Sequence, residues 1–232
     1  MRNVLITGGS RGIGRACVER FAAEGERVFF TYKSNSAAAE EVSEKTGAIA
    51  VKAGDIGLLK ETVGKYGRLG VLVNNAGIAG QKLFQDITEC DWDEMFDTNV
   101  RDMFLAAKAF YDDFIHEKYG RIINISSVWG VSGASCEVHY SASKAAVIGF
   151  TKALAKEAGP SGVTVNCIAP GVIDTDMNAP LGRETLNALA CETPLCRLGT
   201  AGDVAELAVF LASDKASFIT GQVIGCDGGF GI

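Results

Sequence analysis

The sequence is poor in proline and histidine and carries no surplus of basic charge. It has 4 prolines and 2 histidines in 232 residues, and its formal net charge is −6. The scarcity of proline excludes a proline-rich linker between domains. His116 and His139 stand far apart in the sequence, so no metal site is indicated. A protein that binds duplex nucleic acid usually presents a basic face, and the acidic balance argues against that role.

The sequence also lacks a long apolar run and any Cys-x-x-Cys pair. A membrane helix needs about 20 consecutive apolar residues, and no stretch approaches that length. The first residues run straight into Val4-Leu5-Ile6, with no charged and apolar leader before them. The seven cysteines are odd in number and scattered, which is typical of reduced thiols in a cytosol. We therefore expect a cytoplasmic protein whose cysteines mostly pack as small apolar side chains.

A regular alternation of apolar runs and amphipathic segments fills the chain. Seven runs rich in valine and isoleucine predict strands, at 4–7, 28–32, 49–51, 71–74, 121–126, 163–168 and 222–226. The segments between them predict helices, at 12–24, 36–46, 58–66, 91–116, 140–158 and 202–213. Strands that are apolar on both faces are covered by helices on both sides. The pattern predicts one α/β domain over residues 1–232, with a doubly wound parallel sheet.

The stretch 175–194 is the least regular part of the chain. It carries Met177, Leu181, Leu186 and Leu189 among polar residues. This composition suits a helical flap with an apolar underside. A plain surface helix that covers the core fits the same composition, so both interpretations stay open at this point.

A glycine-rich turn follows the first predicted strand. Its residues are, in order, Thr7, Gly8, Gly9, Ser10, Arg11, Gly12, Ile13 and Gly14. Because glycine has no Cβ, backbone N–H groups can approach a pyrophosphate there, and the N-terminus of the following helix adds unpaired donors. A glycine-rich turn is common in ordinary loops as well. Its place at the start of a βαβ unit favours a dinucleotide site.

The end of the second predicted strand lacks the acid that holds the ribose 2′-hydroxyl in NAD-binding folds. No Asp or Glu lies between Glu26 and Glu40, and Tyr32 is followed by Lys33. A lysine at this place would attract a 2′-phosphate, and Arg11 could reach the same group. Two solvated surface cations would also explain these residues. The missing acid together with the two cations favours NADP(H) over NAD(H).

Tyr140 and Lys144 lie four residues apart at the start of a predicted helix, so their side chains share one face. A free tyrosine has a pKa near 10. A cation about 4 Å away, at an effective dielectric of roughly 20, is worth about 4 kcal/mol, which is enough to bring that pKa toward 7. The pair therefore predicts Tyr140 as a general acid or base.

Two further polar residues stand where chemistry or hydrogen bonding is indicated. Ser127 lies just past the strand 121–126, and substrate chemistry gathers at the carboxyl ends of parallel strands. Its hydroxyl could hydrogen-bond a developing alkoxide, although a turn or cap is the ordinary role of serine. Asn99 lies inside a predicted helix, which asparagine disfavours, so a special hydrogen-bonding role is indicated.

Taken together, these residues resemble the motif set of the short-chain dehydrogenase/reductase family, and most of all its 3-oxoacyl-(acyl-carrier-protein) reductases. The match runs in order from residue 4 to residue 230. The residues that carry it are Thr7, Gly8, Gly12, Ile13, Gly14, Asn74, Asn75, Ala76, Gly77, Asn99, Ser127, Tyr140, Lys144, Asn166, Pro170, Gly171, Thr175, Thr220, Gly221, Gln222, Asp227, Gly228 and Gly229.

The resemblance implies a single-domain Rossmann fold of seven strands and an NADP(H)-dependent enzyme of fatty acid biosynthesis. The enzyme would reduce the carbonyl of a 3-oxoacyl thioester to a secondary alcohol. Tyr140 would donate the proton, and Ser127 would hydrogen-bond the same oxygen. Lys144 would bind the nicotinamide ribose and lower the tyrosine pKa, and Asn99 would hold a water that links Lys144 to solvent. The cofactor site would comprise Gly8, Ser10, Arg11, Gly12, Ile13, Gly14, Lys33, Asp55, Asn74, Ala76, Gly77, Tyr140, Lys144, Pro170, Gly171, Ile173 and Thr175.

The resemblance also implies a flap at 175–194 over the substrate and a homotetramer built through the helices near 91–116 and 140–158 and the C-terminal segment. Acyl carrier protein is a possible partner, because Lys118 and Arg121 would place basic side chains at the active-site mouth. Ser161, however, stands where the carrier-protein enzymes often have a basic residue.

Two alternatives remain open at the level of the sequence. One is an enzyme of the same family that acts on another ketone or alcohol, such as a sugar, a steroid or a small ketone. The other is a regulator that binds NADP(H) without turnover. Such a regulator would have no chemical need for the four residues Asn99, Ser127, Tyr140 and Lys144, all of which are present.

Overall fold

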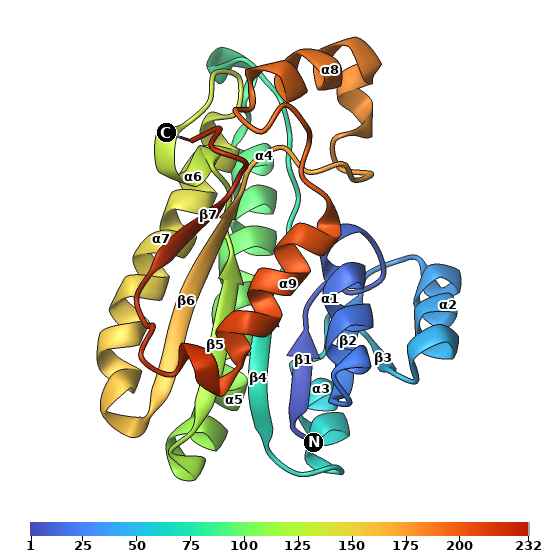
Figure 1. The fold of residues 1–232 in the computed structure, drawn as a ribbon, viewed down its shortest axis with the longest axis vertical. Coiled ribbons are helices and arrows are strands. Elements are labelled where there is room, and N and C mark those ends of the chain that lie inside the picture. Colours follow the sequence, from blue (N-terminus) through green and yellow to red (C-terminus); the bar gives the residue numbers. More distant parts are fainter. Residues whose placement is uncertain (232) are drawn as a thin grey trace.

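Seven parallel strands form one sheet at the centre of the molecule (Figure 1). The structure is a computed structural model, and it describes residues 1–231. The strand order is β3-β2-β1-β4-β5-β6-β7, so the order reverses between β1 and β4. Ligands of such sheets bind outside the carboxyl ends of the strands at this point of reversal. The strands are β1 (Asn3–Ile6), β2 (Arg27–Tyr32), β3 (Ile49–Lys52), β4 (Leu69–Asn74), β5 (Gly120–Ile125), β6 (Val163–Pro170) and β7 (Val223–Cys226).

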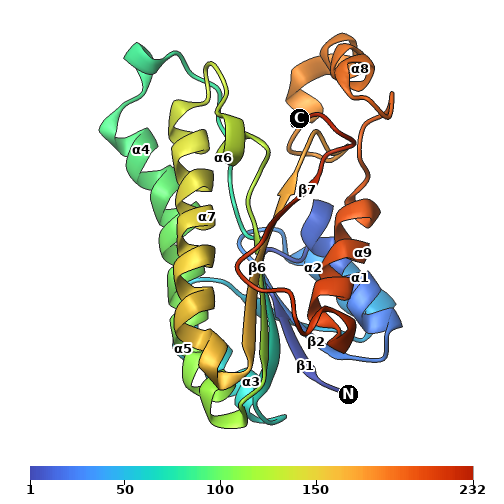
Figure 2. The same cartoon turned by 60° about the vertical axis from the view of Figure 1, so that its left-hand side comes forward.

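Helices cover both faces of the sheet. With the sheet seen nearly edge-on, α1, α2 and α9 lie on one side, and α4, α5 and α7 lie on the other (Figure 2). The helices are α1 (Gly12–Ala23), α2 (Ser36–Thr46), α3 (Ile56–Gly64), α4 (Glu89–Phe96), α5 (Asp102–Glu117), α6 (Trp129–Ser132), α7 (Val138–Ala158), α8 (Gly182–Glu192) and α9 (Ala201–Ala212). Among residues 1–231, no helix is long and apolar enough to cross a membrane.

The apolar core has two layers, one on each face of the sheet. Ile6 and Phe30 belong to the layer that packs against α1 and α9, whereas their neighbours Leu5 and Phe29 belong to the layer that packs against α3, α5 and α7. Successive residues of a strand point to opposite faces, so each strand contributes to both layers. This two-sided burial fixes the strands in place, and with them the loops at their carboxyl ends.

The predicted fold class and all seven predicted strands are confirmed, with each strand end within two residues of the prediction. The predicted helix over 91–116 is wrong in one respect. It is divided into α4 and α5 by a π-helical turn over Asp97–Arg101, which holds Asn99. A π-helical turn contains an extra residue relative to an α-helix and often marks a functional site. The short helix α6 was not predicted.

The segment 175–194 contains a short 3₁₀ turn at Ala179–Leu181 and the helix α8. No described residue of α8 is buried, and Met177 before it is 48% exposed. In Figure 1, α8 stands at the top, beyond the carboxyl ends of the strands. Leu186 and Leu189 of α8 are partly buried, and closure of this segment over a substrate stays a prediction.

Candidate active site

The glycine-rich turn after β1 is bound to the loop after β4. The hydroxyl oxygen of Thr7 accepts hydrogen bonds from the backbone N–H groups of Asn75 and Ala76, at 3.0 and 2.9 Å. The side-chain amide of Asn75 in turn donates to the carbonyls of Thr7 and Gly8, at 2.9 and 3.1 Å. These bonds join the two loops on either side of the point where the strand order reverses.

The turn has the shape that a pyrophosphate needs. Gly8 and Gly12 have φ values of 68° and 53°, a region that side chains disfavour. A Cβ on Gly14 would lie 2.1 Å from the carbonyl oxygen of Gly8. No side chain caps the N-terminus of α1, and its first turn has no acid. The free backbone donors and the positive end of the helix dipole therefore face a surface without side chains, which fits a dinucleotide phosphate.

The residues expected to contact the two ends of the cofactor lie at the same edge of the sheet. The methyl group of Thr175 lies 3.6 Å from the position of a Cβ on Gly12, so the segment after β6 approaches the turn. Arg11 and Lys33 are exposed and follow the neighbouring strands β1 and β2. Asp55 follows β3 and caps α3, because its carboxylate accepts a hydrogen bond from the N–H of Leu58 at 2.9 Å. The contact of Asp55 with adenine stays a prediction.

Ser127, Tyr140 and Lys144 are buried together beside this edge, with exposed fractions of 6, 8 and 5%. Tyr140 and Lys144 project from one face of α7, and Ser127 follows β5. The hydroxyl oxygen of Ser127 accepts the N–H of Trp129 at 3.2 Å. That bond leaves the serine proton free for a second partner, and the Ser127 hydroxyl acts on the pKa of Tyr140.

The expectation that Lys144 lowers the pKa of Tyr140 is not what the structure shows. Burial raises the pKa of Tyr140 to about 12, and only the Ser127 hydroxyl acts in the opposite direction. Lys144 is not among the groups that act on this pKa, and its Nζ lies 5.7 Å from the centre of the tyrosine ring. Tyr140 is therefore protonated at neutral pH, which is the state that a proton donor requires.

Lys144 is itself perturbed by its surroundings. Burial lowers the pKa of its ammonium to about 8, while the thiol of Cys167 on β6 acts in the opposite direction. Nζ donates a hydrogen bond to the carbonyl of Ile125 at 3.0 Å. A pKa near neutrality means that Lys144 can both release and accept a proton under ordinary conditions.

Asn99 reaches the same cluster from the π-helical turn, and it is 2% exposed. Its Oδ1 accepts the N–H of Ile78 at 2.8 Å, and its Nδ2 donates to the carbonyl of Ile78 at 3.0 Å. A Cβ on Gly77 would lie 3.1 Å from Asn99 Oδ1 and 3.3 Å from Lys144 Nζ. The amide oxygen and the ammonium therefore border one space beside Gly77. The sequence indicated the residue through its unusual place inside a helix, but not its partners.

Asn74 and Pro170, two other predicted cofactor residues, take part in hydrogen bonds that connect the elements around the site. The Nδ2 of Asn74 donates to Asn124 Oδ1 at 2.8 Å, and the Nδ2 of Asn124 donates to Thr151 Oγ1 at 2.9 Å. This chain ties β4, β5 and α7 together. The carbonyl of Pro170 accepts the N–H of Val128 at 2.8 Å, which joins the loops after β5 and β6. Cofactor contacts of Asn74 and Pro170 stay predictions.

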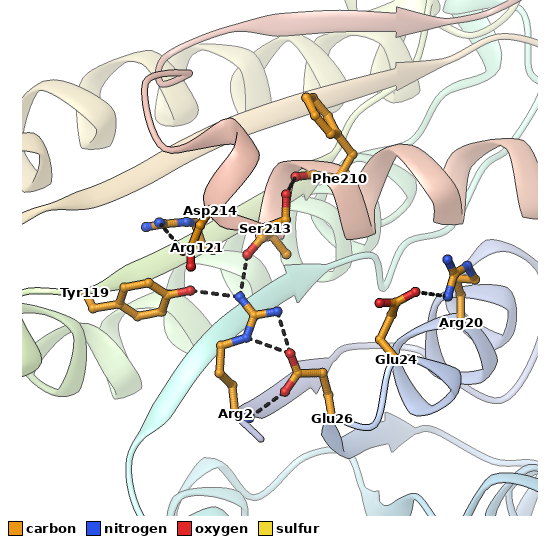
Figure 3. Close-up of polar contacts among 10 residues, drawn as sticks. Arg2, Arg20, Glu24, Glu26, Tyr119, Arg121, Phe210, Ser213 and Asp214 are labelled. Atoms are coloured by element: carbon orange, nitrogen blue, oxygen red, sulfur yellow. Dashed lines mark hydrogen bonds and ion pairs between the residues drawn. The ribbon is translucent and has the colours of Figure 1, made fainter.

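Lys118 and Arg121 are not at the mouth of this chain's active site, so that expectation is wrong. Both residues lie at the start of β5, whereas Ser127 follows its end, and the two ends of a strand lie at opposite edges of a sheet. Arg121 is 4% exposed; it pairs with Asp214 at 3.3 Å and lies over the ring of Tyr119 at 4.4 Å (Figure 3).

Arg2 belongs to the same edge and joins four elements of the fold. Its guanidinium donates to the Glu26 carboxylate at 2.7 Å, to the Tyr119 hydroxyl at 2.8 Å and to the carbonyl of Ala212 at 2.6 Å (Figure 3). These contacts connect the starts of β1, β2 and β5 with the end of α9. Arg2 and Arg121 therefore hold this edge of the sheet together.

The comparisons with known proteins agree with this geometry. A family model described as enoyl-(acyl carrier protein) reductase matches residues 8–231. The chain is 42% identical to the 3-oxoacyl-[acyl-carrier-protein] reductase FabG of Aquifex aeolicus (strain VF5), over 97% of this chain and 95% of the relative. Proteins of the same name from Chlamydia muridarum (strain MoPn / Nigg) and Escherichia coli (strain K12) are 39% and 37% identical, with the same coverage of both chains.

Proposed function

This chain belongs to the short-chain dehydrogenase/reductase family and is an NAD(P)-dependent oxidoreductase, and we propose that it reduces the keto group of a 3-oxoacyl thioester with NADPH. The observation that carries the proposal is the joint burial of Ser127, Tyr140 and Lys144 at the carboxyl edge of the sheet, next to the glycine-rich turn. Relatives that match nearly the whole chain are named as reductases of this substrate class. A regulator that only binds the cofactor is set aside, because these relatives are named as enzymes.

The residues of the chain divide the reaction between them. A bound NADPH would supply the hydride for the carbonyl carbon, and the carbonyl oxygen would then need a proton. Tyr140 is protonated at neutral pH, because burial raises its pKa to about 12, and it donates that proton. The Ser127 hydroxyl hydrogen-bonds the same oxygen and stabilises the charge that develops on it.

Lys144 and Asn99 restore the proton of Tyr140. Lys144 has a pKa of about 8, so it exchanges protons readily at neutral pH, and it holds the ribose of the cofactor. Asn99 borders the same space beside Gly77 as the lysine ammonium and holds the water through which Lys144 reaches solvent.

The preference for NADPH depends on Arg11 and Lys33. Both are exposed cations at the ends of neighbouring strands, β1 and β2. Burial raises the pKa of the Asp102 carboxyl, and the Lys33 cation acts against that rise, so Lys33 lies within electrostatic reach of the start of α5. A 2′-phosphate bound beside Lys33 would replace the Asp102 carboxylate as the negative partner of the Lys33 cation.

The proposal includes a cytoplasmic homotetramer built through α4, α5 and α7, with an acyl carrier protein presenting the substrate. The exposed apolar side chains of Phe104 and Leu105 on α5, which are 42 and 41% exposed, support an interface on this face. The flap with α8 would close over the acyl chain. Light scattering of the purified protein measures the oligomeric state directly.

The first test is the oxidation of NADPH by the purified protein in the presence of acetoacetyl-coenzyme A, followed by the near-ultraviolet absorbance, with NADH in a parallel reaction. Turnover that is much faster with NADPH than with NADH is the expected result. Binding of NADPH without turnover of any 3-oxoacyl thioester would overturn the substrate, and would direct the search to sugars, steroids and small ketones.

A further inference from the structure

Ser143 is a buried hydroxyl inside the catalytic helix, one residue before Lys144. Its side chain is fully buried, and its Oγ donates a hydrogen bond to the carbonyl of Tyr140 at 2.8 Å. A serine inside a helix often makes such a bond to the preceding turn. A hydroxyl has one proton, so the bond to Tyr140 leaves Ser143 as an acceptor toward any other group.

The second partner of Ser143 is the amide of Asn99. The Nδ2 of Asn99 donates to Ser143 Oγ at 3.0 Å. Asn99 otherwise bonds to Ile78 in the loop after β4, and its Nδ2 lies 3.1 Å from the Sδ of Met95 on α4. Ser143 is thus the residue that ties the amide to α7, the helix that carries Tyr140 and Lys144. Asn99 stands on a π-helical turn, a feature that is frequent at functional sites.

We propose that Ser143 is a positioning residue for proton transfer, whose hydroxyl holds the Asn99 amide oxygen against the Lys144 ammonium beside Gly77. The ammonium has three protons, and the carbonyl of Ile125 takes one of them. The amide oxygen of Asn99 borders the same space beside Gly77 and accepts a hydrogen bond from another of the ammonium protons, directly or through one water. Without the hydroxyl, the amide keeps its bonds to Ile78 and its contact with the Sδ of Met95, but it loses its bond to the helix that carries Lys144.

The titratable neighbours of Lys144 are few, which makes the effect measurable. They are Cys167 on β6 and Tyr140 on α7, and Glu137 acts on Tyr140. Among the described residues, none of these titratable groups is bonded to Ser143 Oγ, whose bond to Tyr140 is to the backbone carbonyl. The side-chain route from Ser143 toward Lys144 therefore runs through Asn99.

The proposal rests on the proposed function, and its test is the pH dependence of kcat for Ser143→Ala. The midpoint of the limb that reports Lys144, about 8 in the parent protein, should move to lower pH, because the cation loses an acceptor. We expect kcat at neutral pH to fall about tenfold, a part of the roughly 10²- to 10⁴-fold that positioned acid–base catalysis contributes. The KM for NADPH should change little.

The matched control is Thr46→Val on α2. The Thr46 hydroxyl donates to the carbonyl of Val42 at 2.6 Å and accepts the N–H of Ala48 at 3.1 Å. It therefore makes the same pair of bonds as Ser143, on a helix that carries none of the proposed catalytic residues. Its loss should lower stability and leave the pH profile in place. An equal shift of the profile in Thr46→Val would overturn the positioning role.

A second readout does not depend on turnover. In protein labelled with ¹⁵N-asparagine, the Asn99 side-chain amide, assigned by its loss in Asn99→Asp, should follow the titration of Lys144 in the parent protein. In Ser143→Ala that titration should weaken or move to lower pH. If both the amide titration and the pH profile of kcat were unchanged in Ser143→Ala, the positioning role of Ser143 would be wrong. Failure of the parent protein to reduce acetoacetyl-coenzyme A would refute the proposed function instead, while the amide titration would still decide the role of Ser143.

Discussion

A Cβ on Gly14 would lie 2.1 Å from the carbonyl oxygen of Gly8. No side-chain rotation can relieve this clash, because the opposing atom belongs to the backbone. The start of α1 is therefore packed directly on the turn that faces the expected pyrophosphate.

Gly14→Ala should open this turn and weaken NADPH binding by at least about tenfold, or about 1.4 kcal/mol. The Kd measured by nucleotide fluorescence checks the effect. Gly64→Ala is the control, since a Cβ at the end of α3 meets no atom within 4 Å; it should keep binding intact and stabilise the protein by about 0.5–1 kcal/mol. Equal NADPH affinities for Gly14→Ala and the parent protein would place the phosphate elsewhere.

Tyr140→Phe should lower kcat by at least about 10²-fold, because the ring remains but the transferable proton is lost. The Kd for NADPH should stay within a small factor of the parent value. Tyr111→Phe on α5, whose hydroxyl lies near Glu157 rather than Ser127, should retain full turnover. Near-normal kcat in Tyr140→Phe would show that another group donates the proton.

Lys33→Asp should shift the cofactor preference from NADPH toward NADH, because a carboxylate repels a 2′-phosphate and can accept a hydrogen bond from the 2′-hydroxyl. The ratio of kcat/KM for the two cofactors measures the shift, which we expect to reach about tenfold or more. Lys60→Asp on the exposed surface of α3 controls for the change in net charge. An unchanged preference for NADPH in Lys33→Asp would indicate that Arg11, rather than Lys33, binds the 2′-phosphate.

Lys144→Met should stabilise the protein at neutral pH and progressively less at alkaline pH. The pKa of Lys144 is lowered from 10.5 to about 8 by burial, so the unfolded chain binds more protons between these values and the stability of the parent protein rises with pH through this window. Below this pH window both the folded and the unfolded chain carry the Lys144 charge. Burial of that charge then lowers the free energy of unfolding by its full cost, of the order of a few kcal/mol. Urea unfolding of both proteins from about pH 7 to about pH 10 measures the difference, and a gap that stays constant across the window would show that burial does not perturb the lysine.

The strands and the phosphate turn could be predicted because their signals are local. An apolar run such as Leu69–Asn74, or the glycines at 8, 12 and 14, predicts the local structure from a few neighbouring residues alone. Tyr140 and Lys144 stand on one helix, so their spacing alone placed them on a common face.

The remaining features depend on contacts between distant segments. The sequence does not show that the Lys144 ammonium donates to the carbonyl of Ile125 on β5, nor that burial raises the pKa of Tyr140. The link between Asn99 and Ser143 spans 44 residues and a π-helical turn that no periodicity reveals. The expectation for Lys118 came from the family resemblance, which does not take into account that Lys118 precedes β5 whereas Ser127 follows it.

The segment that begins with β7 is a brace for the catalytic edge as well as a strand of the sheet. The N–H of Gly171 binds the carbonyl of Cys226 at 3.1 Å, and the N–H of Leu195 binds that of Gly228 at 3.2 Å. The rings of Trp129 and Phe230 meet with their centres 5.5 Å apart. Residues 226–230 thus hold together the loop after β6, the end of the flap and the turn after Ser127, three segments that lie far apart in the sequence.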